Sequence, residues 1–126
     1  MTLRQVIETV DALKPNQFTT AQKISWLSQC DSAIYSNLVL THEQEGGAAP
    51  GGFAGYGEGD MERELIAKAP YDILYRHYLE SRIDLYNKEN NNYNNTNALY
   101  TTAYTAFASW YTQNHMPRRA ATHFKL

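Results

Sequence analysis

All seven glycines of this 126-residue chain lie between residues 46 and 59, and the rest of the sequence contains none. Glycine permits backbone angles that other residues avoid, and it destabilises the interior of a helix. The cluster therefore interrupts regular secondary structure before the middle of the chain. It forms either a linker between two small domains or a long loop within one domain.

Chain length favours the single domain. A linker at this place would leave segments of about 45 and about 66 residues, and isolated cores of that size are marginally stable. A chain of 126 residues fits one ordinary domain. Long loops in such a domain are mostly functional or disordered. We therefore expect a single helical domain over residues 1–126, with a mobile glycine-rich loop at about residues 43–60.

Composition excludes several classes of protein. An apolar content of 43%, with 13% aromatic residues, is typical of a folded globular chain. The single cysteine, Cys30, rules out an internal disulfide and suits a reducing compartment. No stretch of the sequence approaches the ~20 apolar residues of a membrane span, and the first residues do not resemble a signal peptide. We expect a soluble, intracellular protein with no membrane partner.

Apolar periodicity predicts helices on both sides of the glycine cluster. A helical spacing runs from Leu3 to Leu13, with Thr2 as its N-cap, and Pro15 follows it. A second helix is expected from Thr19 or Thr20 to about His42. The short connection between them indicates an antiparallel hairpin.

The second half of the chain predicts two longer helices. The third should run from about residue 71 to residue 90, with Pro70 as its first helical residue. The asparagine-rich residues 90–95 should separate it from a fourth helix, which Asn95 or Thr96 would cap and which would end before Pro117. Residues 64–67 (ELIA) are compatible with a short strand or a buried crossing. The predicted fold is all-α, about four helices in a small bundle, with a long glycine-rich loop and a short strand or hairpin as an open alternative beside it.

Five large side chains are expected to share one core. They are Trp26, Leu74, Tyr78, Phe107 and Trp110.

The sequence contains no arrangement typical of catalysis. The four histidines are scattered and form no metal-binding motif. Glu80 and Asp84 stand one helical turn apart, a spacing that suits a metal or acid–base chemistry but is common on exposed helix faces. Cys30 is expected to be a buried thiol, and the glycine cluster lacks the lysine of a phosphate-binding loop. We therefore predict no catalytic residue, no metal and no cofactor, and a protein that is not an enzyme.

Charge is unevenly distributed along the chain. Six acidic residues and one arginine lie between Glu43 and Glu64, whereas no acid follows Glu89 and the last nine residues contain Arg118, Arg119 and Lys125. These segments are either solvated surface or complementary patches on neighbouring subunits, and the basic tail could instead face a phosphate backbone. Ten tyrosines add large, rigid side chains that suit a core or a protein interface.

Residues 69–119 resemble the C-terminal half of small head–tail connector proteins of tailed phages and prophages. The matching elements are Pro70-Tyr71-Asp72, Leu74-Tyr75, Tyr78-Leu79, Ile83-Asp84, Asn87, Glu89, Tyr93-Asn94-Asn95, Trp110-Tyr111 and His115-Met116-Pro117. A looser similarity covers Pro15-Asn16-Gln17-Phe18, Lys23, Trp26-Leu27 and Asp31. This chain departs from the family in its notably glycine-rich loop.

The resemblance implies a structural component of the virion neck. Such a protein would form a homo-oligomeric ring between the portal and the tail-completion proteins, in the host cytoplasm during assembly and then in the virion. The predicted assembly residues are Phe53, Tyr56, Glu58, Asp60 and Glu62 in the loop region, and Arg118 and Arg119 in the tail. The alternative is a small DNA-binding or DNA-channel protein that uses the basic tail, with at most transient contact with DNA in the connector case.

Overall fold

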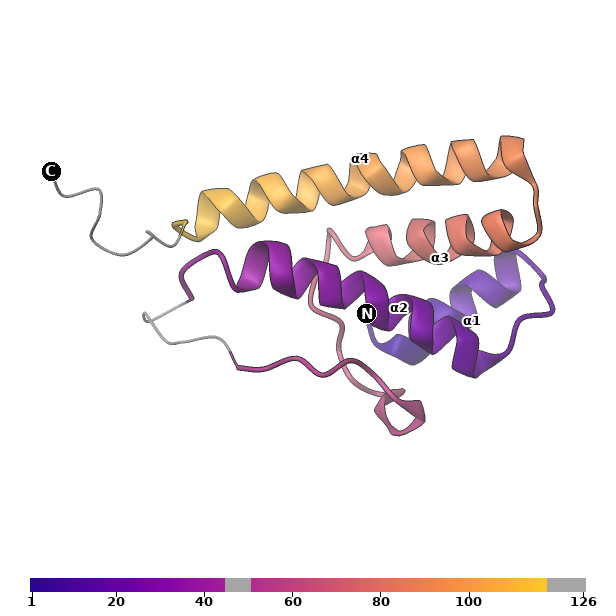
Figure 1. The fold of residues 1–126 in the computed structure, drawn as a ribbon, viewed down its shortest axis with the longest axis horizontal. Coiled ribbons are helices and arrows are strands. Elements are labelled where there is room, and N and C mark those ends of the chain that lie inside the picture. Colours follow the sequence, from indigo (N-terminus) through magenta and orange to yellow (C-terminus); the bar gives the residue numbers. More distant parts are fainter. Residues whose placement is uncertain (45–50, 118–126) are drawn as a thin grey trace, which may run out of the picture.

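The computed structural model describes residues 1–44 and 51–117 of the chain, and these form a helical bundle (Figure 1). The helices are α1 (Leu3–Leu13), α2 (Thr20–Ile34), α3 (Ile73–Tyr86) and α4 (Asn90–Asn114). A π-helical segment, η1 (Tyr35–Val39), extends α2, and a short 3₁₀ turn, η3 (Glu58–Asp60), follows the glycines. The predicted all-α fold is confirmed. The described residues contain isolated β-bridges but no β-strand.

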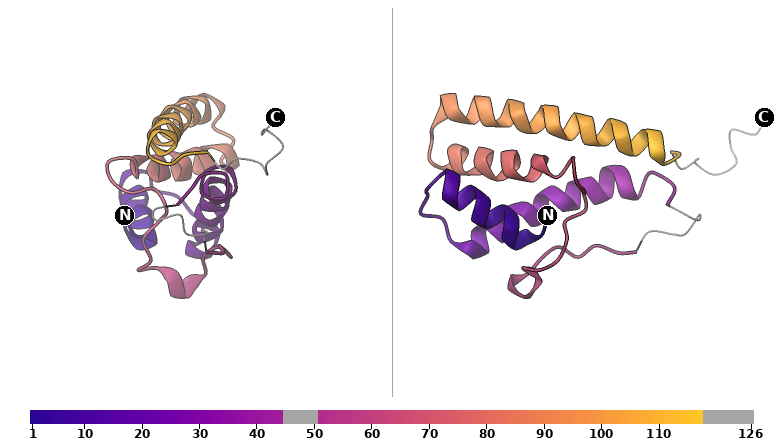
Figure 2. Two further views of the ribbon diagram at one scale, coloured as in Figure 1. Left: turned by 90° about the vertical axis from the view of Figure 1, so that its left-hand side faces the viewer. Right: turned by 180° about the vertical axis from the view of Figure 1, so that it is seen from behind.

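The helices are arranged in three layers. Seen end-on, α3 lies between α4 on one side and the antiparallel pair α1 and α2 on the other (Figure 2). Helix α3 contacts each of the other three helices. Because neighbours cover it from opposite sides, α3 buries polar as well as apolar residues. The buried residues are Leu74, Tyr75, Leu79, Glu80, Ser81, Ile83 and Asp84.

The predicted start of the first two helices is confirmed in detail. Thr2 caps α1 through a capping box with Gln5, whose backbone amide donates to the Thr2 hydroxyl at 3.2 Å. Thr19 caps α2 in a similar way, with the Gln22 amide donating to its hydroxyl at 3.1 Å. Both caps satisfy amide groups that would otherwise lack a partner in the first turn of a helix.

Residues 64–67 form the buried crossing and not a strand. Leu65 and Ala67 are fully buried, and the Leu65 amide donates to the Met1 carbonyl at 3.1 Å. Nearby, the Leu3 amide donates to the Arg63 carbonyl at 3.1 Å. The chain therefore passes from the loop across the start of α1 before it enters α3.

The predicted start of the third helix and the predicted break between the third and fourth helices were both wrong. Pro70 precedes α3 in a turn in which the Tyr71 amide donates to the Lys68 carbonyl at 2.8 Å, and the helix begins at Ile73. The asparagine run lies inside α4, which begins at Asn90. The break falls earlier, where Lys88 has a φ angle of 61°. Asparagine is a weak helix former, but packing against α3 outweighs this local preference.

One hydrophobic cluster draws residues from all four helices. Trp26, Leu74 and Phe107 are buried in it, and Tyr78 packs partly buried against it, as predicted. Trp110 is an exception, because 38% of its surface is exposed. Its ring packs against Tyr71 at 5.3 Å, on the flank of α4. The prediction that Trp110 belongs to the core was therefore wrong.

Phe107 and Trp110 provide a matched test of this packing. Phe107→Ala should lower the free energy of unfolding by ~3–5 kcal/mol, because a fully buried ring leaves a cavity. Trp110→Ala should lower it by less than half as much, since water already reaches the indole. Urea denaturation of both variants measures the difference. Equal losses, or a larger loss for Trp110→Ala, would contradict the placement of these two rings.

Candidate functional site

The second half of the glycine-rich region runs along α2. The Tyr35 hydroxyl donates to the Gly51 carbonyl, and the Phe53 ring lies 5.9 Å from Tyr35 and 5.1 Å from Tyr56. Gly51 and Phe53 therefore contact η1, and Tyr56 packs against Phe53. Mobility of the loop at about residues 43–60 stays a prediction, and residues 45–50 lie outside the described part of the chain.

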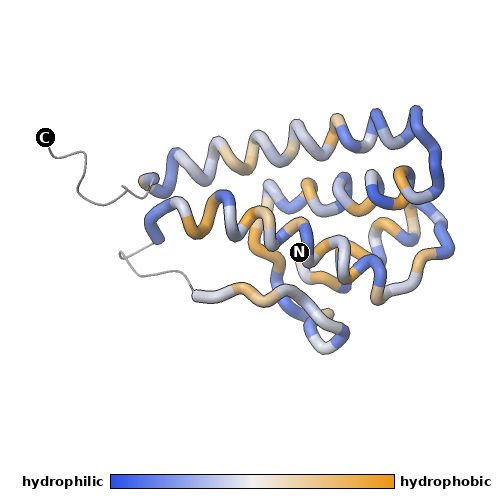
Figure 3. Tube along the Cα trace, viewed as in Figure 1, coloured by the Kyte–Doolittle hydropathy of each residue, from blue (hydrophilic) through white to orange (hydrophobic). Residues whose placement is uncertain are grey.

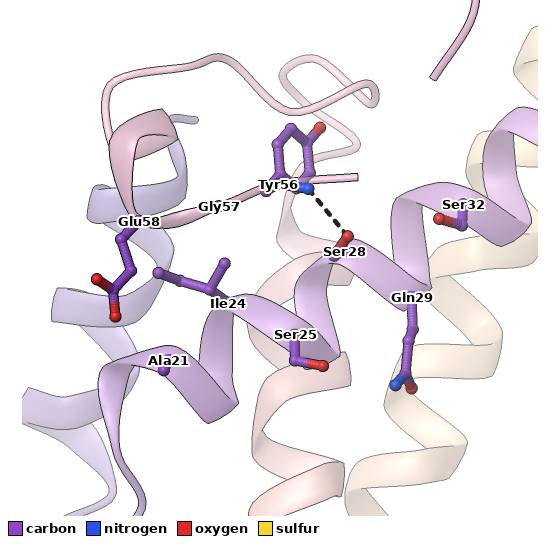
Figure 4. Close-up of a pocket in the computed structure, with 9 residues that line it drawn as sticks. All are labelled: Ala21, Ile24, Ser25, Ser28, Gln29, Ser32, Tyr56, Gly57 and Glu58. Carbon is purple, nitrogen blue, oxygen red and sulfur yellow. Dashed lines mark hydrogen bonds between the residues drawn. The ribbon is translucent and has the colours of Figure 1, made fainter. Parts of the chain in front are cut away.

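Gly55 explains why at least one glycine is needed here. Its φ angle is +93°, and a Cβ atom at this position would lie 2.5 Å from the Ser28 hydroxyl oxygen. That same oxygen accepts a hydrogen bond from the Tyr56 amide at 3.0 Å (Figure 4). A side chain at residue 55 would therefore be strained and would separate the loop from α2.

One polar contact of the loop is with a buried carboxylate, Asp31 on α2, which other segments of the chain also contact. Asp31 is fully buried and accepts hydrogen bonds from the Tyr75 hydroxyl at 2.5 Å and the Ile66 amide at 3.1 Å. The Tyr56 hydroxyl donates to the same carboxylate. The Tyr75 oxygen also accepts from the Ala67 amide at 2.7 Å. We call Asp31, Tyr56 and Tyr75, with the two amides, the Asp31 cluster.

Burial dominates the electrostatics of this cluster. It raises the pKa of Asp31, although hydrogen bonds from the two tyrosines and the Ile66 amide oppose the rise. Burial and the neighbouring carboxylate raise the pKa of both tyrosine hydroxyls. The tyrosines therefore act as neutral hydrogen-bond donors, and no proton transfer is needed for the cluster to hold the loop.

The three acidic residues predicted to act in assembly, Glu58, Asp60 and Glu62, differ in their surroundings. Glu58 is exposed at the end of the groove described below. Asp60 accepts a hydrogen bond from the Gly57 amide at 2.7 Å, and Glu62 forms an ion pair with Arg4 of α1. Glu62 therefore already has a basic partner within the chain.

Phe53 and Tyr56 are brought together, but the Tyr56 hydroxyl points inward to Asp31. Arg118 and Arg119, the other predicted assembly residues, lie outside the described residues. The assembly role of all seven predicted residues stays a prediction.

A shallow groove of about 500 Å³ lies between α2 and residues 56–58. Figure 4 shows the side chains that line it, most of them small and uncharged. They are Ala21, Ile24, Ser25, Ser28, Gln29, Ser32, Tyr56, Gly57 and Glu58. Glu58 is the one carboxylate among them, so the lining residues offer no pair of groups for acid–base catalysis.

Glu80 and Asp84 are buried, contrary to the expectation of an exposed helix face. Asp84 is fully buried and accepts hydrogen bonds from the Lys14 ammonium at 2.6 and 2.7 Å and from the Thr96 hydroxyl at 2.9 Å. Glu80 pairs with Arg76 at 3.2 Å. Each carboxylate therefore has its own cationic partner. Asp84 links α3 to Lys14 at the end of α1 and to Thr96 of α4, whereas the Glu80–Arg76 pair lies within α3.

Cys30 is a buried thiol, as predicted. Burial raises its pKa, and the nearby Asp31 carboxylate adds to the rise. A thiol that resists ionisation is a poor nucleophile.

Within residues 1–44 and 51–117, no group of three or more His, Cys, Asp or Glu side chains could hold a metal ion. No helix in this part of the chain is long and apolar enough to cross a membrane. No protein-family model matches the chain, and no curated protein or solved structure matches it.

The Asp31 cluster was missed at the level of sequence. Asp31 falls within the apolar stripe of α2, and a carboxylate at a core position must find hydrogen-bond donors. The sequence therefore indicated that Asp31 needs donors, but the two tyrosines that supply them lie 25 and 44 residues further along the chain. Sequence spacing does not identify which of the ten tyrosines supply them.

Loss of the Tyr75 hydroxyl tests the cluster. Tyr75→Phe should lower the free energy of unfolding by ~1.5–3 kcal/mol, because it leaves a buried carboxylate oxygen and the Ala67 amide without a partner. Tyr86→Phe is the matched control, since Tyr86 is 56% exposed and keeps its stacking on Trp26. It should change stability by less than ~0.5 kcal/mol. Urea denaturation giving equal effects for the two variants would contradict the role of Tyr75.

The raised pKa of Asp31 makes stability depend on pH. Because the folded protein holds this proton more tightly than the unfolded chain, Asp31 contributes most below its unfolded pKa of ~3.9. The contribution falls as pH rises from there through the folded pKa, and then levels off. The wild type should therefore lose stability relative to Asp31→Asn over this interval. Denaturation across the acidic range measures the difference, and a constant or growing wild-type advantage would show that the pKa is not raised.

Proposed function

We propose that this chain is a non-enzymatic structural protein that joins head and tail in a tailed phage or prophage particle. It would form a ring between the portal and the tail-completion proteins, in the host cytoplasm during assembly and then in the virion. The resemblance of residues 69–119 to head–tail connectors is the basis for this choice of particle. The helical fold agrees with that resemblance.

The surface of α4 is the observation that carries an assembly function. This helix has 25 residues and contains no Asp, Glu, Lys or Arg, and it buries only Phe107 and Tyr111. In Figure 3, much of α4 beyond its asparagine-rich start is pale, which marks residues that are neither strongly hydrophilic nor strongly hydrophobic. Protein interfaces are depleted of charged residues at their centres. A long, exposed and charge-free helix is therefore suited to being covered by another protein.

The composition of α4 supports the same interpretation. Threonine, asparagine and serine are weaker helix formers than the lysine and glutamate common on exposed helices. These residues give α4 little intrinsic stability, so packing on α3 must hold it. A further contact on the outer side of α4 would add to its stability. Assembly would therefore make this helix more ordered.

A ring also requires two different complementary surfaces on each subunit, because a head-to-tail contact repeats around the axis until it closes. The loop region beside α2 and the outer side of α4 lie in different layers of the fold (Figure 2). The molecule therefore offers separate surfaces to two neighbours.

Deletion of the gene in its phage or prophage tests the proposed function. Induced cells should then accumulate filled heads and free tails that do not join, and electron microscopy of the lysate measures this. Expression of the wild-type protein from a plasmid should restore joined particles, and mass spectrometry should detect the protein in them. Joined, infectious particles in the absence of the gene would overturn the proposal.

A further inference from the structure

We propose that α4 of one copy packs along α2 and η1 of the next copy. Neighbouring subunits would then meet through two different helical faces, both free of charge. The inference rests on the proposed function in taking the assembly to be a ring, and it goes further by naming the two faces that meet.

The outer face of α2 and η1 carries no exposed charge. Between residues 19 and 41 the charged residues are Lys23 and Asp31, which are 4% and 0% exposed. The exposed side chains of α2 and η1 are mostly small or polar and uncharged: Thr20, Ala21, Gln22, Ser25, Gln29, Ser32, Ala33, Ser36 and Asn37. We call these residues the α2 face.

The corresponding surface of α4 has two large apolar side chains. Leu99 is 51% exposed and Trp110 is 38% exposed, and Ala106 is exposed between them. Leu99 and Trp110 are three helical turns apart, roughly 16 Å, and so lie on one side of the helix. We call Leu99, Ala106 and Trp110 the α4 ridge. Trp110 packs against Tyr71, whereas Thr112 on the other flank of α4 lies 3.3 Å from His42 at the end of η1.

Exposed charges occupy the remaining surfaces. Within the described residues they lie on α1, at Glu43, in residues 58–68 and in the turn between α3 and α4. Packing an uncharged face against any of these would remove charges from water without a partner, which is costly. The α2 face and the α4 ridge are the helical surfaces of the described chain that can cover each other without this penalty.

Shape favours the same pairing. On its α2 side the groove is lined from Ala21 to Ser32 by uncharged side chains, most of them small, over three helical turns or roughly 16 Å; Glu58, at the end of the groove, is its one charged lining residue. The two bulky residues of the α4 ridge have the same separation. The ridge of one copy can therefore lie along the α2 side of the groove in another, from Ala21 to Ser32, with both large side chains in contact. Pairing of α4 with α4 would instead be symmetric, would close as a dimer and would leave the α2 face uncovered.

Two single substitutions distinguish these arrangements. Ala106→Glu places a charge on the α4 ridge, and Ser25→Glu places one on the α2 face; both residues are exposed, so the fold should be kept. Ala12→Glu is the matched control, because it adds the same charge to an exposed position on the already charged α1. Thermal unfolding checks that all three variants fold. Sedimentation velocity then measures the size of each variant alone and in mixtures.

The proposal predicts a specific pattern. The wild type and Ala12→Glu should self-associate, while Ala106→Glu and Ser25→Glu should each remain monomeric. A mixture of the two monomeric variants should form a one-to-one dimer and nothing larger, because each supplies the face that the other has lost.

Several results would overturn the pairing. Ser25→Glu that assembles normally would show that the α2 face is not part of the contact, and no dimer in the mixture would exclude the two faces as partners. A wild type that stays monomeric at concentrations on the order of 1 mM would also overturn it. If heads and tails still fail to join after gene deletion, these outcomes reject the pairing and leave the proposed function standing.

Discussion

The buried carboxylate of Asp31 is the contact on which the arrangement of this molecule depends. It lies on α2 and accepts hydrogen bonds from the glycine-rich loop, from the crossing segment and from α3. A buried carboxylate without such donors would be strongly unfavourable. Burial of Asp31 on α2 therefore depends on all three segments being in place, and their donors in turn depend on Asp31 as acceptor. Gly55 makes the contact geometrically feasible, because it lets the loop backbone approach Ser28 one turn before Asp31.

Within residues 1–44 and 51–117, the outer faces of α2 and α4 are exposed while the loop is anchored in this way. Some acidic residues near the loop form ion pairs within the chain, as Glu62 does with Arg4. In the described part of the chain, exposed charge lies on α1, at Glu43, in residues 58–68 and in the turn after α3, whereas α2 and α4 present uncharged residues. In a ring, the uncharged faces would supply buried contact area, and the charged surfaces would contribute orientation and encounter rate.

Sequence periodicity was sufficient for α1 and α2, because their apolar stripes and capping residues are local signals. It failed where tertiary packing decides. The asparagine run was interpreted as a break, yet α4 begins there because α3 supports it: Thr96 donates to the buried Asp84, and Arg82 lies over the Tyr93 ring. Helix α3 is covered from two sides, so its buried carboxylates could not be recognised from one-sided periodicity. The glycine cluster correctly predicted a long loop at this place in the chain. The sequence did not show that this loop contacts Ser28 and Asp31 on α2.

A reconstruction of the assembled protein by electron cryo-microscopy, at a resolution that traces helices, tests the central claim most directly. The account predicts a closed ring in which α4 of every copy lies against α2 of the next, with the loop still anchored at Asp31. A ring whose copies meet through α1 and α3, with the α4 ridge facing solvent, would contradict it.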